Sequence, residues 1–363
     1  MEISKDQSYS IKGIAIILLV FHHLFYKVER FQPHGIKCLI SFEKLSYIAY
    51  ESRVCVWLFA FVSAYGIAKS LKKATSSQAV NKLFIYRWLS LLSSFWFVYP
   101  IVFVASYLTS HDPWGTYQHN VFFLIFDFMG LSDLLMTPTL GGVWWYMSFA
   151  QVLIVLVFVS YFVIKKIGSL PILAFLFIAS QYVSSDVGLN SRSGGRYIMY
   201  FPIVFIGVEL AVNEWDLVKF KSKLHKVVAA IVLLAISIFL LYVRKSLSLV
   251  ENAPSLRYCN YIVQGYAASI SAVGIISATL LFPTKTKISR ALIFLGKHSG
   301  NIFLVHTFFY VYAPQYVYFS KSVLLSVLTL LLYSLVLSIV IEWLKRKLKY
   351  TQFFSWLKGK LCS

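Results

Sequence analysis

Two basic residues in the first apolar segment are spaced so that they could act together inside a membrane. Lys12 and His23 are eleven positions apart. Eleven residues of α-helix make about three turns, so both side chains lie on one face, about 16 Å apart along the axis. An ionisable residue inside a membrane span is costly, so function is its default interpretation. The other interpretation is that His22 and His23 only form hydrogen bonds between helices.

The composition predicts that these residues belong to an all-α, polytopic membrane protein. Of 363 residues, 59% are hydrophobic and 13% are charged, against about 45–50% and about 25% in soluble domains. Apolar segments near spanning length recur from residue 12 to residue 344. They predict a single transmembrane domain, residues 1–363, with about ten transmembrane helices and a re-entrant or interfacial helix near 121–136. The predicted spans are 12–27, 54–69, 84–108, 143–164, 169–184, 197–213, 224–243, 260–282, 297–313 and 322–344.

The net charge of +20 is mainly a topology signal. With the N-terminus in the cytoplasm, 23 of the 34 Lys and Arg residues lie on the inner side. Cytoplasmic loops carry such an excess, so we expect a multi-pass protein of the plasma (inner) membrane with both termini cytoplasmic. The charges are scattered over short loops that meet membrane lipid, which argues against a nucleic-acid partner. The four cysteines show no metal-ligand spacing, so no metal site is predicted.

Five segments, in order, carry motifs that belong together. They are Lys12 to His23, Arg53 to Gly66, Trp144-Trp-Tyr-Met147, Tyr197 to Gly207 and Leu295-Gly-Lys-His-Ser-Gly-Asn-Ile-Phe-Leu-Val-His306. This series resembles the membrane acyltransferase-3 family, whose first helix has a basic residue, ten intervening residues and a histidine. The family's second helix usually has a Ser-Gly step, where this chain has Ser63-Ala64. Its third helix often begins with Arg-x-x-Arg, but this chain has Arg87-Trp-Leu-Ser90, so only Arg87 carries over.

The resemblance implies a membrane O-acyltransferase. Such an enzyme moves an acyl group, most often acetyl, from cytoplasmic acyl-CoA to a hydroxyl of a cell-surface or lipid-linked saccharide. Acetyl-CoA or another acyl-CoA is then a co-substrate, and no permanently bound cofactor is expected. The oligomeric state stays open.

The resemblance and the residue chemistry together assign expected roles. His23 is the expected proton-transfer residue, and His306 is a second catalytic candidate at similar depth. Whether His23 deprotonates the sugar directly or first carries the acyl group is open. Lys12 and Arg87 are expected to bind donor phosphates, because cations at the inner mouth suit a polyanion. Arg53 and Arg196, near the outer ends of their helices, either orient the acceptor or contact lipid headgroups.

Three further expectations concern other polar and aromatic residues. Glu209, inside a predicted span, is expected either to pair with a buried cation or to handle protons. Asp127 is expected either to orient a histidine or to be exposed to solvent. The most plausible sugar platform among the aromatic residues is a cluster of Trp114, Tyr117, Trp144 and Trp145.

Two alternatives stay open at this point. One is a transporter or flippase of a lipid-linked sugar, which would share the number of spans and the buried charges. The other is a member of the same family that uses succinyl-CoA or acts on peptidoglycan. The ordered motifs favour an acyltransferase over a transporter.

The predicted topology can be tested with single cysteines. Cysteines replacing Lys72 and Lys221 should be shielded from an impermeant thiol reagent in intact cells, because they lie in predicted cytoplasmic loops. Cysteines replacing Asp112 and Asn190 should be labelled. Labelling of the first pair in unbroken cells would reverse the orientation.

Overall fold

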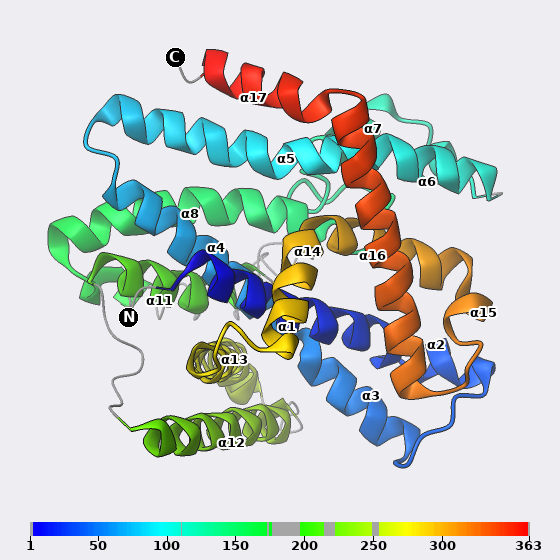
Figure 1. Cartoon of the computed structure of the whole chain (residues 1–363), viewed down its shortest axis with the longest axis horizontal. Helices are drawn as coiled ribbons and strands as arrows, with labels where there is room; N and C mark the ends of the chain where they lie inside the picture. Colours follow the sequence, from blue (N-terminus) through cyan, green and yellow to red (C-terminus); the bar gives the residue numbers. More distant parts are fainter. Residues whose placement is uncertain are drawn as a thin grey trace. The chain divides into compact units, whose positions relative to one another are not determined.

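The described part of the chain folds into helices joined by turns and loops (Figure 1). The computed structural model describes residues 3–109, 111–172, 174–175, 197–213, 222–248 and 254–361. Within these ranges the regular secondary structure is helical, and an isolated β-bridge joins Lys37 and Ser322. The longer helices are α1 (Lys5–Phe25), α3 (Phe42–Glu51), α4 (Cys55–Lys72), α5 (Ser77–Leu108), α8 (Trp145–Ile167), α11 (Phe201–Val212), α12 (Lys223–Ser248), α13 (Pro254–Leu281), α14 (Lys287–Tyr312), α16 (Val323–Lys347) and α17 (Tyr350–Leu361).

Five segments are long and apolar enough to cross a membrane. They are α1, the stretch from α3 through α4, α5, α8 and α16. The all-helical class is therefore confirmed for the described residues, whereas the count of ten spans stays a prediction. In α14, polar residues such as Lys297, His298 and Asn301 interrupt the apolar sequence. The predicted span 169–184 lies largely outside the described residues.

The first helix begins earlier than its apolar sequence predicts. It starts at Lys5 rather than near Lys12, because Ser4 and Gln7 form a reciprocal capping box. The Ser4 backbone N–H donates to Gln7 Oε1 at 2.9 Å, and the Gln7 N–H donates to Ser4 Oγ at 3.2 Å. The helix then runs unbroken through His23. Lys12 and His23 therefore lie on one helix face, as the spacing predicts.

The short apolar run after residue 120 forms a smaller helix than predicted. Helix α7 (Val121–Phe128) has eight residues, and turns follow it up to residue 136. The Asn120 side chain accepts a hydrogen bond from the Phe122 N–H and starts the helix. Eight residues are too few to cross a hydrocarbon core, in agreement with the prediction that this run is not a span. Its re-entrant or interfacial position stays a prediction.

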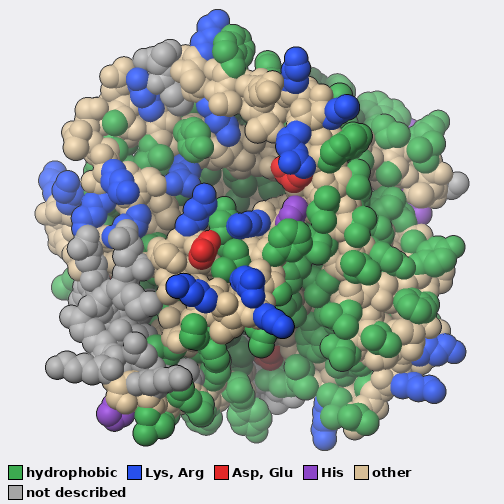
Figure 2. Space-filling model, in the orientation of Figure 1, with side chains coloured by type: hydrophobic (Ala, Val, Ile, Leu, Met, Phe, Trp, Pro, Cys, Tyr) green, Lys and Arg blue, Asp and Glu red, His purple; other side chains and the backbone are tan. Residues whose placement is uncertain are grey.

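Helix α16 turns its apolar residues outward and its small polar residues inward. Leu324, Leu328, Leu332 and Val336 follow one another at four-residue intervals, and each is more than half exposed. Buried Ser326, Ser334 and Ser338 occupy the other side. This arrangement is typical of a helix that faces lipid on one side and packs through small residues on the other. Figure 2 likewise shows broad hydrophobic areas and few acidic side chains on the face it presents.

The helices belong to two compact units, each made of three chain segments. Unit 1 comprises residues 1–12, 54–80 and 152–293, and unit 2 comprises residues 13–53, 81–151 and 294–363. In unit 1, α12 packs against α13, and α11 packs against α4 (Figure 1). The single O–H of Ser271 in α13 is shared between the Ala267 carbonyl oxygen of its own helix, at 2.8 Å, and the Ser237 carbonyl oxygen of α12, at 3.1 Å. Unit 2 holds the histidines singled out by the sequence.

A glycine makes the close approach of α4 and α11 possible. A Cβ on Gly207 would lie 3.1 Å from the Ala64 Cβ and 3.1 Å from the Phe61 carbonyl oxygen. Both neighbours belong to a helix that would have to move to admit a methyl group. Small residues at such crossings let the helix backbones pack directly.

Replacing Gly207 with Ala should therefore lower the stability of the protein by about 1–3 kcal/mol through overpacking. The matched control is Gly300→Ala in α14, where an added Cβ meets nothing within 4 Å. In the control, Ala should stabilise the helix by about 0.5–1 kcal/mol. Thermal unfolding in detergent measures both changes, and equal shifts would contradict the close-packing argument.

Candidate active site

Two histidines that are 283 positions apart in the sequence meet inside unit 2. His23 lies in the last turn of α1, and His306 lies in α14. Their ring centroids are 5.0 Å apart, with the ring planes inclined at 48°. His306 is fully buried and His23 is half-buried. The structure thus brings together the two catalytic candidates of the sequence.

The hydrogen bonds of His306 define which ring nitrogen carries its proton. Nδ1 lies 2.8 Å from the Phe303 carbonyl oxygen and 3.2 Å from the Ile302 carbonyl oxygen. A carbonyl oxygen can only accept, so Nδ1 must be the protonated nitrogen. Nε2 is buried and has no hydrogen-bond partner within the described residues. In the neutral ring, Nε2 therefore presents an unused lone pair, which is the requirement for a proton acceptor.

An arginine that the sequence analysis did not single out lies next to this pair. Arg30 belongs to the short helix α2 (Val28–Phe31) that follows α1. Its guanidinium carbon is 4.8 Å from the ring centre of Tyr26 and 4.8 Å from that of Tyr310. It also donates a hydrogen bond to the His23 carbonyl oxygen. Two cation–π contacts and this bond fix the guanidinium beside the end of α1.

A cavity of about 250 Å³ opens next to His23. Its walls come from the chain at the end of α1, from Val102 in α5, from residues 140–144 and from α14. Tyrosine, tryptophan and phenylalanine rings make much of the lining, and His23 and Arg30 supply the polar end. The members from the end of α1 and from α14 are His23, Tyr26, Arg30, Leu304, Thr307, Phe308, Tyr310, Val311 and Tyr312.

A buried carboxyl group holds the segment that forms one cavity wall. Asp127 at the end of α7 is fully buried. Its Oδ2 accepts hydrogen bonds from the Leu140 N–H at 2.9 Å and the Tyr117 hydroxyl at 2.7 Å, and Oδ1 accepts one from Ser132 at 2.8 Å. Burial raises the pKa of Asp127, and these hydrogen bonds oppose the rise. Burial and the adjacent carboxylate raise the pKa of Tyr117, so its hydroxyl stays a donor.

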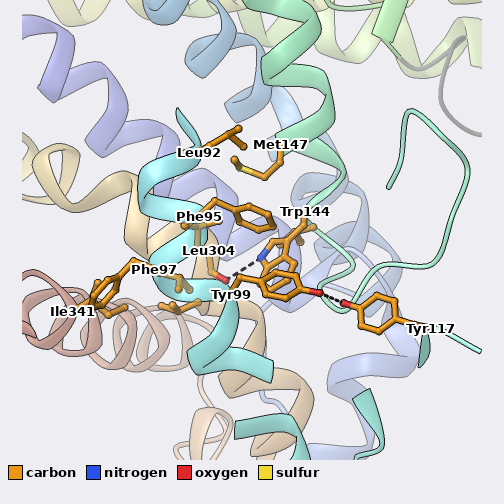
Figure 3. Close-up of a cluster of buried hydrophobic side chains, with 12 residues drawn as sticks. Leu92, Phe95, Phe97, Tyr99, Tyr117, Trp144, Met147, Leu304 and Ile341 are labelled. Atoms are coloured by element: carbon orange, nitrogen blue, oxygen red, sulfur yellow. Dashed lines mark hydrogen bonds between the residues drawn. The ribbon is translucent and has the colours of Figure 1, made fainter. Parts of the chain in front are cut away.

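Behind the cavity, an aromatic cluster continues from this network (Figure 3). The Tyr117 hydroxyl lies 2.6 Å from that of Tyr99 in α5. The Trp144 indole packs edge-to-face on Phe95, with ring centroids 4.9 Å apart, and donates to the Leu304 carbonyl oxygen at 3.2 Å. One side of Trp144 therefore belongs to the core while another borders the cavity.

The two expected donor-binding cations are not brought to this cavity. Lys12 is half-buried on α1, with its Nζ 6.0 Å from the ring centre of Tyr9. Arg87 is half-buried in α5. Lys12 belongs to unit 1 and Arg87 to unit 2, and neither lines the cavity beside His23. Their joint role at a donor site stays a prediction.

The remaining basic candidates have other surroundings. His22 donates through Nδ1 to the Ala49 carbonyl oxygen at 2.8 Å and stacks on Tyr26, which ties α1 to α3. Arg53 lies in a 3-10 turn, Ser52–Val54, with its guanidinium 4.0 Å from the ring centre of Tyr50. It is not among the cavity residues. Arg196 lies outside the described residues.

Both expectations for Asp127 are wrong, because its carboxyl group is neither exposed nor bonded to a histidine within the described residues. Of the four residues expected to form a sugar platform, Trp144 lines the cavity, and the sugar-binding role itself stays a prediction. Tyr117 and Trp144 are 0% and 1% exposed, and Trp114 is 38% exposed. Glu209 accepts hydrogen bonds from Ser169 and from the Asn213 amide, the latter at 2.5 Å. Hydroxyl and amide donors thus surround that carboxylate.

Comparison with known proteins identifies the family. The sequence model of the acyltransferase-3 family, described as an acyltransferase domain, matches residues 10–343. The chain belongs to this family. No curated protein and no solved structure matches the chain. Family membership and the long apolar helices together make the protein a membrane acyltransferase in general terms.

For this acyltransferase, the sequence alone could not locate every residue of the site. His23 and His306 stand out because they are polar residues in apolar helices that match family motifs. Arg30 follows the end of α1, where helical periodicity stops, so it reads as one more charge outside the span. Tyr26 and Tyr310 are two of 24 tyrosines. Only the tertiary contacts distinguish them from interfacial aromatic residues.

Two adjacent glycines in the cavity wall give a test of this geometry. A Cβ on Gly141 would lie 2.6 Å from the Trp144 ring, whereas a Cβ on Gly142 would meet nothing within 4 Å. Gly141→Ala should therefore displace the buried indole and lower the free energy of unfolding by about 1–3 kcal/mol. Gly142→Ala should leave it nearly unchanged. Thermal unfolding compares the two variants, and equal destabilisation would contradict the packing of Trp144 against this wall.

Proposed function

We propose that the protein is a membrane O-acyltransferase that transfers an acyl group from acyl-CoA to a saccharide hydroxyl. The acyl group that we propose is acetyl. The observation that carries the proposal is the His23–His306 pair at an aromatic cavity in a chain of the acyltransferase-3 family. The saccharide belongs to the cell surface or to a lipid-linked precursor. We place the protein in the plasma membrane with both termini in the cytoplasm, in keeping with the distribution of Lys and Arg.

In the proposed reaction, His23 accepts the proton of the acceptor hydroxyl as its oxygen attacks the thioester carbonyl carbon. The carbon–sulfur bond breaks, and the CoA sulfur leaves and takes up a proton. The products are the O-acyl ester and free CoA thiol. His306, whose Nε2 lone pair is unused, orients His23 by accepting a hydrogen bond from its N–H as the site closes around the substrates.

The proposed donor site is separate from the cavity. The cavity volume of about 250 Å³ lies below the roughly 300–1,000 Å³ of pockets that bury a drug-sized ligand. It suits an acyl group and a single sugar ring better than a whole CoA molecule. We therefore assign the nucleotide phosphates to Lys12 and Arg87, because a guanidinium binds phosphate through two parallel hydrogen bonds.

Family membership and cavity size both favour an enzyme over a transporter or flippase. A lipid-linked oligosaccharide is much larger than this cavity. The donor is tested directly by incubating the purified protein with labelled acetyl-CoA and with labelled succinyl-CoA. Release of CoA thiol from one of them identifies the donor, and release from neither would contradict the proposal.

Replacing His23 or His306 with Ala should lower acyl transfer by about 100-fold or more, because proton transfer loses its acceptor or the group that orients it. The matched control is His225→Ala, since His225 is an exposed histidine of α12. His22→Ala should instead lower stability, because the bond to Ala49 is lost. Mass spectrometry of surface glycans from cells with each variant measures transfer. Normal acylation with His23→Ala would refute the assignment.

A further inference from the structure

We infer that the acceptor is an anionic saccharide whose carboxylate or phosphate group binds Arg30. The inference rests on the proposed function, since it names the substrate class for that same cavity. It draws on three features of Arg30: its place in the cavity wall, the absence of acidic side chains from that wall, and its fixed position relative to His23.

Arg30 is held in the cavity wall without an acidic partner. Its guanidinium lies between the rings of Tyr26 and Tyr310 and lines the cavity together with His23. The described residues that line the cavity include neither Asp nor Glu. Within the described residues, Arg30 forms no ion pair with a carboxylate, and its hydrogen bonds go to the His23 carbonyl oxygen and to Tyr310. A half-buried cation in this setting is compensated best by an anion that enters the cavity.

The guanidinium has more donors than the protein uses. It carries five N–H groups in a planar fork, and its two acceptors among the described residues leave several of them unused. Carboxylate and phosphate groups match that fork in a bidentate manner. Neighbouring aromatic rings provide apolar walls for the faces of a sugar ring.

The position of Arg30 also relates anion binding to the reaction. Its bond to the His23 backbone ties the guanidinium to the residue proposed to accept the hydroxyl proton. An anion bound there fixes the sugar next to the His23 imidazole. Arg30 would thus orient the acceptor and select acidic sugars over neutral ones.

A second cation of unit 2, which is buried, shows the contrast. Lys345 is 5% exposed, and its ammonium group bonds to Glu342 at 2.8 Å, Asn301 at 3.2 Å and Ser94 at 3.3 Å. Those three acceptors satisfy all three of its N–H groups. The cavity of about 540 Å³ beside Lys345 therefore offers no comparable unused donors from this residue.

The test measures binding to the purified full-length protein without acyl-CoA. The probes are a galacturonate trisaccharide, its carboxyl-reduced galactose counterpart and galactose 1-phosphate. The wild-type protein should bind at least one acidic probe about 10- to 100-fold more tightly than the neutral one, and added salt should reduce that preference. Comparing the trisaccharide with the sugar phosphate tells carboxylate from phosphate. Equal affinity for acidic and neutral probes, or no binding of either acidic probe, would overturn the inference.

Variants then assign the preference to Arg30. Arg30→Gln should abolish it, and Arg30→Lys should restore part of it because a point charge lacks the planar fork. The matched control, Lys44→Gln, removes an exposed cation of α3 outside the cavity and should change nothing. If Arg30→Gln keeps the preference, Arg30 only caps α1. If Arg30→Gln does not fold, Arg30→Lys and the wild-type comparison still decide.

The two proposals fail in different ways. Transfer to neutral and acidic acceptors with equal efficiency would leave the acyltransferase function intact and refute the role of Arg30. Binding of acidic probes without any release of CoA thiol would refute the proposed reaction and leave the anion site standing.

Discussion

In a hydrocarbon environment, each buried polar group must find its partner within the protein, and this constraint shapes the chain at every level. Helices satisfy the backbone. The Ser269, Ser271 and Thr279 hydroxyls return their hydrogen bonds to carbonyl oxygens four residues earlier in α13. Lys345 and Glu342 form an ion pair that Asn301 completes. The protein thus uses most of its buried polar chemistry for structure. In the described part of the chain, the His306 Nε2 is buried without a hydrogen-bond partner, as are a few hydroxyls and the Trp57 N–H. His306 differs from these groups because the unused atom is a basic nitrogen next to a second histidine.

The same constraint explains how a short, irregular segment can border the cavity. Residues 129–144 leave helical geometry, so their backbone groups need other partners. Asp127 supplies one for the Leu140 N–H, and the Gln151 and Ser148 side chains donate to the Gly130 carbonyl oxygen. Trp144 then closes the wall from behind by bonding to α14. Side chains, including the buried Asp127 carboxylate, thus supply hydrogen bonds to backbone groups of this loop that a helix would supply from its own backbone.

The sequence predicts which residues share a face of one helix, but it does not predict most contacts between residues of distant segments. The shared face of Lys12 and His23 follows from spacing alone. The capping box of Ser4 and Gln7, which starts the first helix at Lys5, lies before the apolar run and was not predicted. The burial of Asp127 was not, because its donors come from residues 117, 132 and 140 in separate turns. Arg30 acquires its meaning only from Tyr310, far along the chain. Local periodicity carries no information about such contacts.

The cavity beside His23 is too small to hold both substrates of the proposed reaction whole. A volume of about 250 Å³ leaves no room for a nucleotide and a polysaccharide together. In the proposed reaction only the reacting ends of the two substrates would meet there, so most of their binding energy would come from contacts outside the cavity. Lys12, about 16 Å from His23 along α1, fits a remote donor contact. Arg30, bonded to the His23 backbone, fits a local acceptor contact. The donor contact and the acceptor contact would then lie at different positions along the first helix. The reacting groups of both substrates would meet at the two histidines.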